Sequence, residues 1–222
     1  MGFVGPMQIS LIYAAFVALV YIETDRFVVD APMLSAFPVV MLGLLTLTVN
    51  MSAKPKLLTT LYFLASAHGI YRISTSRFYM EWSALELSLA NIFYLFSFIS
   101  LLRKIWLYLT FVTTLYVVGF TYFCFADLVI SIPFLVIMLT IGAATVAISM
   151  ICAGSVWRYS AKFTDARQAS LMRFCGLLLN LTCMSAFLFS QFATRKNQML
   201  WFMNVAHYVA QLLLCLANER TF

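Results

Sequence analysis

Residues 133–156 read PFLVIMLTIGAATVAISMICAGSV and contain no charged side chain. A helix needs about 20 predominantly apolar residues to cross the hydrocarbon core of a bilayer, so this stretch is long enough to span a membrane by itself. The whole chain of 222 residues shares this character, because 64% of its residues are hydrophobic and 10% are charged. Soluble domains have roughly 25% charged residues. The sequence therefore predicts an integral membrane protein.

Similar apolar segments fill the chain on both sides of this stretch, separated by charged residues, prolines and glycines. They lack the alternation of apolar and polar residues that a membrane β-barrel requires. Residues 54–56 are expected to form a turn, 157–173 a long polar loop and 218–222 a short tail. We expect an all-α integral membrane bundle, one transmembrane domain over residues 1–222, with eight helices at 6–22, 32–51, 57–73, 83–102, 105–126, 133–156, 174–192 and 199–217.

Charge and cysteine patterns exclude several functions. The formal net charge is +6, but the 14 Lys and Arg residues occur singly or in pairs between apolar segments, unlike the clustered basic surface that nucleic-acid binding requires. The five cysteines include no C-x-x-C pair and are interpreted as small buried hydrophobic residues. No metal and no cofactor is expected. Haem ligation would need His68 and His207, the only histidines, to face one pocket, which nothing in the sequence indicates.

The distribution of basic residues between the spans predicts an orientation. With eight spans both termini lie on one side, and about nine of the 14 Lys and Arg residues fall on that side, against about five on the other. The positive-inside rule then places both termini in the cytoplasm. If the chain is eukaryotic, we expect the endoplasmic reticulum as its membrane.

Several polar residues fall inside the predicted spans, where a charged side chain costs about 2.5 to 3.5 kcal/mol on insertion scales. In 199–217 they follow the i, i+3, i+4, i+7 spacing of one helical stripe, which should face the interior. The last two spans contribute Asn180, Asn204, His207, Tyr208 and Gln211; the third and fourth contribute His68, Arg72, Glu86 and Asn91. Such residues either hydrogen-bond between helices or form a site. A pairing of Glu86 with Arg72 or His68 could serve either purpose.

Four local stretches resemble the YhhN-like lysoplasmalogenase family of membrane enzymes. Residues 206–213, AHYVAQLL, look like the family's closing Tyr-Tyr-x-Ala-Gln-x-Leu pattern, and 176–192 has the length of its penultimate span. Residues 64–68, LASAH, are similar to a segment that normally ends Gly-Asp, and 89–94, LANIFY, to one that normally carries a His. The resemblance implies a multi-pass enzyme that hydrolyses the vinyl-ether bond of lysoplasmalogens.

The resemblance also implies site residues. His68 and Met184 stand where the family has two intramembrane aspartates, Asn91 where it has a His, and Phe37 where it has a Lys. Vinyl-ether hydrolysis requires a positioned acid and an anion, and Met184 can supply neither. We therefore expect His68 as general acid and Glu86 as stabilising anion. The residues expected to bind the lysophospholipid in a cavity between the third, fourth, seventh and eighth spans are Arg72, Asn91, Asn180, His207, Tyr208 and Gln211.

Other functions remain open on the sequence alone. A relative that has kept the fold but lost the chemistry is one. A non-catalytic accessory subunit, packed against a protein partner or a second copy of the chain in the membrane, is another. Transport is a third, for which Pro133 and Gly119 are weak indications, since a proline at a helix start is ordinary. A filled core and a broad apolar outer face would favour the accessory subunit over the hydrolase.

Overall fold

The structure, a computed structural model, describes residues 5–27, 29, 31–76, 79–159, 164–194 and 200–222, and every regular element within them is helical. This confirms the expected all-α bundle. A 3-10 turn at Ile99–Leu101 follows α4, and a π-helical turn at Ser190–Thr194 follows α7. The α-helices in chain order are α1 (Pro6–Glu23), α2 (Pro32–Thr48), α3 (Ala53–Thr75), α4 (Met80–Phe98), α5 (Leu107–Phe125), α6 (Pro133–Tyr159), α7 (Thr164–Phe189) and α8 (Leu200–Thr221).

Prolines mark the starts of several helices. Pro6, Pro32 and Pro133 are the first residues of α1, α2 and α6. This position suits proline because its φ angle is already helical and its missing N–H has no partner in the first turn. Pro55 lies in the first turn of α3 for the same reason, so the turn expected at residues 54–56 is wrong: these residues begin the helix.

The long polar loop expected at residues 157–173 is also wrong. Helix α6 continues to Tyr159 and α7 begins at Thr164, so most of this segment is helical. Its residues include Ala, Arg and Gln, which favour helix, and Asp165 in the first turn complements the helix dipole of α7. Similarly, α8 continues to Thr221 and takes up most of the expected tail.

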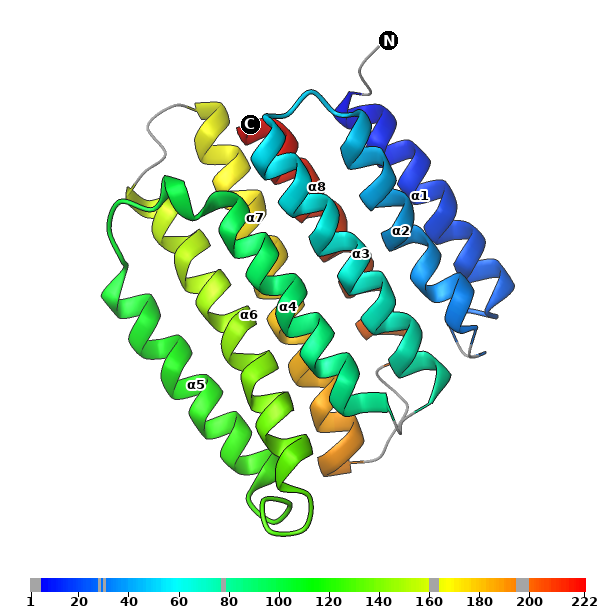
Figure 1. Ribbon diagram of the computed structural model, residues 1–222, viewed down its shortest axis with the longest axis vertical. Helices are drawn as coiled ribbons and strands as arrows, with labels where there is room; N and C mark the ends of the chain where they lie inside the picture. Colours follow the sequence, from blue (N-terminus) through cyan, green and yellow to red (C-terminus); the bar gives the residue numbers. More distant parts are fainter. Residues whose placement is uncertain (1–4, 28, 30, 77–78, 160–163, 195–199) are drawn as a thin grey trace.

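The helices form two packed layers that run nearly parallel to one axis (Figure 1). Neighbouring helices follow the order α1, α2, α3, α4, α6, α5 in one layer, and α7 and α8 pack together behind it. Helix α7 contacts α6, while α8 contacts α1, α2 and α3. Consecutive helices run in opposite directions, so the ends of α1 and α8 nearest the termini lie at the same end of the bundle (Figure 1). We call this the terminal end.

The outer surface of the bundle is apolar. On α5, at the edge of the first layer, Leu107, Phe111 and Tyr122 are 77%, 67% and 75% exposed, which water would disfavour and lipid would not. Within the described residues, the helices long and apolar enough to cross a membrane are five: Pro6–Glu23, Met80–Leu101, Leu107–Phe125, Pro133–Tyr159 and Thr164–Phe192. Helix α2 is apolar but has 17 residues, and α3 and α8 are more polar. The coarse prediction of a helical membrane bundle holds.

Candidate functional site

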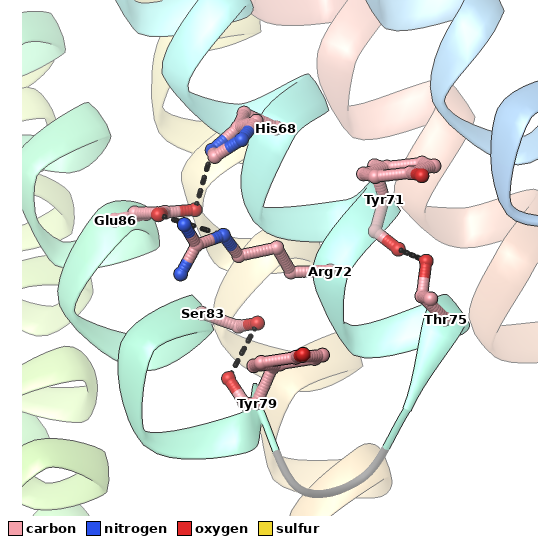
Figure 2. A network of polar contacts seen from close by, with 7 residues as sticks. All are labelled: His68, Tyr71, Arg72, Thr75, Tyr79, Ser83 and Glu86. Carbon is pink, nitrogen blue, oxygen red and sulfur yellow. Dashed lines mark hydrogen bonds and ion pairs between the residues drawn. The ribbon is translucent and has the colours of Figure 1, made fainter.

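Three charged side chains meet between α3 and α4. His68 Nδ1 lies 2.9 Å from Glu86 Oε2, and Arg72 Nε lies 3.3 Å from Glu86 Oε1. Figure 2 shows His68 and Arg72, one helical turn apart on α3, both reaching toward Glu86 on α4. Because a carboxylate accepts hydrogen bonds, the imidazole carries its proton on Nδ1 and turns Nε2 away from Glu86. Both pairings considered from the sequence are therefore present, each on its own carboxylate oxygen.

This charged cluster, His68, Arg72 and Glu86, opens onto the outer surface of the bundle. The side chains are 55%, 35% and 22% exposed, respectively. Arg72 lies in the last turn of α3, at the end of the bundle opposite the terminal end, and its guanidinium lies 5.9 Å from the ring centroid of Tyr79. His68 lies one turn deeper. The cluster therefore combines access from outside with a position near one end of the helices.

Hydroxyl groups around the cluster bond within their own helices. Thr75 Oγ1 donates to the Tyr71 carbonyl over 2.7 Å, and Ser83 Oγ donates to the Tyr79 carbonyl over 2.9 Å (Figure 2). These bonds satisfy the hydroxyl donors without using the carboxylate of Glu86. Each oxygen of that carboxylate instead faces one basic residue from α3, which fixes its orientation between the two helices.

The polar stripe of α8 faces the interior, as expected, but it does not join the charged cluster. Gln211 Oε1 accepts a 2.7 Å hydrogen bond from the hydroxyl of Tyr62 on α3, and both side chains are buried. Tyr208 donates to the Ser35 carbonyl on α2 over 2.9 Å. Tyr62 and His68 are six residues apart, which puts them on different sides of α3 at about 100° per residue. The structure therefore does not bring His68, Tyr208 and Gln211 together around one cavity, and that prediction is wrong.

The remaining predicted site residues are dispersed. Asn91 is buried on α4, where its side-chain amide donates to the Leu87 carbonyl over 2.7 Å, while its Oδ1 has no hydrogen-bond partner among the described residues. His207 Nε2 is likewise buried without such a partner in the described part of the chain. Asn180 is half-buried on α7. These three residues belong to the helix contacts of the interior and not to the charged cluster.

Sequence reasoning missed a second polar network, near the terminal end. Arg173, which was expected in a loop, is fully buried on α7 and donates to Asn218 Oδ1 and Thr221 Oγ1, each over 2.9 Å. The Asn218 amide donates in turn to Thr59 Oγ1 and Ser97 Oγ, over 2.7 and 3.1 Å. The network connects α7, α8, α3 and α4. A helical register through 169–177 was the signal for it, because the buried residues of that stretch recur at helical spacing: Ala169, Ser170, Arg173, Gly176 and Leu177.

Comparisons with protein-family models, with curated proteins and with solved structures find no match to this chain. Among the described residues, no three His, Cys, Asp or Glu side chains come together to form a group that could hold a metal ion. The fold and the composition together define the protein as a helical membrane bundle. Its particular features are a charged cluster on the outer face of α3 and α4 and a buried arginine network at the terminal end.

Proposed function

We propose that the protein binds lysophospholipids on the outer face of α3 and α4 and hydrolyses the vinyl-ether bond of lysoplasmalogens there. The observation that supports this is the 2.9 Å contact between His68 Nδ1 and Glu86 Oε2, which supplies an acid and an anion in one accessible place. The resemblance to lysoplasmalogenases in four sequence stretches points to the same chemistry. His68 in this proposal replaces one of the family's aspartates.

The reaction needs one proton and one water molecule. In its protonated form, His68 transfers a proton from Nε2 to the alkene carbon farther from the ether oxygen, while Glu86 stabilises the imidazolium through Nδ1. Water then adds to the oxocarbenium ion, and its surplus proton returns to the imidazole. The hemiacetal that forms collapses to a fatty aldehyde and the free glycerol hydroxyl. No redox partner is required.

The surroundings of the cluster suit a single-chain phospholipid. Arg72 lies nearer the end of α3 than His68 and offers a guanidinium to the phosphate. Toward the middle of the bundle, Leu64 one turn before His68 and Leu89 one turn after Glu86 are 41% and 46% exposed. An alkenyl chain lying against these leucines places its vinyl ether, where the chain joins the glycerol, at the depth of His68.

The proposal includes a topology. All eight helices cross the membrane, with α3 and α8 tolerated despite their polarity because neighbouring helices pack against them. Both termini face the cytoplasm, since the terminal end carries the larger share of basic residues. We further infer an endoplasmic-reticulum membrane for a eukaryotic source.

A second candidate is a non-catalytic accessory subunit that packs against a protein partner or a second copy of the chain. The exposed aromatic residues of α5 favour it, because Tyr108, Phe111 and Tyr122 form a broad apolar surface that other helices of the bundle leave uncovered. In that case the charged cluster joins α3 to α4 and has no chemical role. The two candidates differ in whether the purified protein turns over a lysoplasmalogen.

The test measures fatty aldehyde released from an alkenyl lysophosphatidylethanolamine by the purified full-length protein in lipid nanodiscs. We expect aldehyde release by the wild type, and its loss in His68→Gln and Glu86→Gln. The matched control is Glu81→Gln, which removes a carboxylate from the first turn of the same helix and should leave turnover unchanged. The saturated alkyl-ether analogue should bind to the protein but should release no aldehyde. A wild type that releases no aldehyde excludes the hydrolase and leaves the accessory subunit.

A further inference from the structure

A second basic site lies at the terminal end of the bundle, away from the charged cluster. It is a cavity of about 390 Å³ lined by Trp106, Trp157, Arg158 and Arg167. Trp106 immediately precedes α5, Trp157 and Arg158 lie in the last turn of α6, and Arg167 lies in the first turns of α7. The cavity is large enough for a small ligand, since such sites commonly measure about 300–1,000 Å³. We call it the Trp–Arg pocket.

Its two aromatic walls are held in place by contacts outside the pocket. The backbone N–H of Trp106 donates to Ser155 Oγ over 2.9 Å, and Ser155 is completely buried in α6. The Trp157 ring stacks on Phe174 of α7 with centroids 5.8 Å apart and planes 7° from parallel. The walls are therefore preorganised by the packing of three helices, α5, α6 and α7.

The guanidinium groups give the pocket its chemistry. The Arg158 guanidinium lies over the ring of Trp106 at 4.4 Å from the centroid and 5.6 Å from the centroid of Tyr159, so two aromatic rings contribute to holding it. Arg167, from the first turn of α7, adds a second guanidinium to the lining. Lys104, 5.4 Å from the Tyr159 ring centroid, adds positive charge nearby. Two planar donors on one cavity match the oxygens of a phosphate.

We propose that the Trp–Arg pocket binds a phosphate group, and that a phospholipid headgroup or a soluble phosphate is its source. Tryptophans favour the membrane–water interface, and basic pockets between helices at this level bind anionic lipid headgroups. The site is separate from the one proposed for hydrolysis. The pocket is built by other helices and lies at the opposite end of the bundle from Arg72. The proposal of a phosphate site therefore does not depend on whether the protein is an enzyme.

The experiment uses native mass spectrometry of the full-length protein in detergent, with phosphatidic acid, phosphatidylcholine and inorganic phosphate as probes. The wild type should retain phosphatidic acid at least tenfold better than phosphatidylcholine. The double variant Arg158→Gln/Arg167→Gln should lose this preference. The matched double variant Lys54→Gln/Lys56→Gln removes the same charge at the same end, from the first turn of α3 outside the pocket, and should keep it. Arg158→Lys, which keeps charge but not the planar fork, should give an intermediate loss.

The outcomes separate the alternatives. Retention of phosphatidic acid that inorganic phosphate does not displace identifies a lipid headgroup as the source. Saturable binding of inorganic phosphate that competes with the lipid identifies a soluble phosphate. Equal losses in both double variants would mean that general electrostatic attraction holds the lipid, and would overturn the proposal. A wild type that does not prefer phosphatidic acid over phosphatidylcholine would overturn it as well. An unfolding curve measured with a thiol-reactive dye shows whether a variant that loses the phosphatidic acid preference is misfolded. If the double variant is misfolded, the intermediate loss expected for Arg158→Lys tests the proposal in its place.

Discussion

Arg173 Nη2 donates to Asn218 Oδ1 over 2.9 Å, and both side chains are completely buried. The guanidinium also lies 4.8 Å from the ring centroid of Phe98. A buried charge of this kind is costly unless it is hydrogen-bonded, and Asn218 shares that role with Thr221 Oγ1 and the Ala217 carbonyl, which also accept from Arg173 Nη2. Since the Asn218 amide then bonds to Thr59 and Ser97, one asparagine links four helices at the terminal end.

Replacing this asparagine should destabilise the bundle. Asn218→Leu removes a hydrogen bond to a charged group, which is worth about 1.5–3 kcal/mol. Asn218→Asp keeps an acceptor for Arg173, and the hydroxyls of Thr59 and Ser97 can rotate to donate to the new carboxylate, so its loss should be smaller. The five free cysteines, all buried or half-buried, allow unfolding to be followed with a thiol-reactive dye. Equal midpoints for Asn218→Leu and the wild type would contradict this account.

A close approach between α7 and α8 depends on Gly176. A Cβ at this position would meet Leu214 Cδ2 at 2.8 Å and the Ala210 carbonyl oxygen at 3.2 Å, and Leu214 is itself completely buried. Gly176→Ala should therefore lower the unfolding midpoint. The control is Gly119→Ala on α5, where a Cβ has nothing within 4 Å and alanine improves helix propensity by about 1 kcal/mol. The reverse order of the two midpoints would show that α7 and α8 do not pack this closely.

The hydrogen bond between Tyr62 and Gln211 should show strong coupling. Tyr62→Phe leaves the buried Gln211 amide oxygen without its 2.7 Å donor, at a cost of about 1–3 kcal/mol. In the double variant Tyr62→Phe/Gln211→Leu neither partner is left unsatisfied, so its loss should be less than the sum of the two single losses. Thermal unfolding of the four proteins in one detergent gives the coupling free energy. Simple additivity would mean that this bond is absent.

Glu86→Gln should scarcely change stability. Its partners are exposed or half-exposed near the end of α3, at the headgroup level that water reaches, where ion pairs contribute about 0–1 kcal/mol. Unfolding midpoints of Glu86→Gln and Glu81→Gln should therefore agree closely. This result would allow a loss of aldehyde release in Glu86→Gln to be assigned to chemistry. A large drop in the midpoint would instead identify the charged cluster as a structural link between α3 and α4.

The topology can be tested with exposed positions at the two ends of the bundle. Asp25 follows α1 at the end opposite the termini, and Arg103 lies at the terminal end. A membrane-impermeant maleimide should label Arg103→Cys from the cytoplasmic side and Asp25→Cys from the other side. The wild type, whose cysteines are buried or half-buried, serves as the background. Labelling of both variants from the same side would exclude the proposed crossing pattern.

The membrane class and the helices of the bundle follow from the amino-acid sequence. Local features are sufficient for this, because length, the absence of charge and prolines such as Pro6 and Pro133 act within one segment. The sequence also allowed a pairing of Glu86 with Arg72 or His68, and the structure contains both. The stripe through Gln211 predicted an interior face, and Gln211 is buried.

Which side of each helix faces the other helices, and which faces lipid, depends on tertiary packing. Inner and outer surfaces are both apolar in a membrane bundle, so hydrophobic periodicity does not distinguish the side facing other helices from the side facing lipid. For that reason His68 was expected in an interior cavity and lies on the outer face, while Arg173 was expected in a loop and is buried. Burial of a polar side chain depends on partners such as Asn218, which lies 45 residues away in the chain and comes close only when α7 packs on α8.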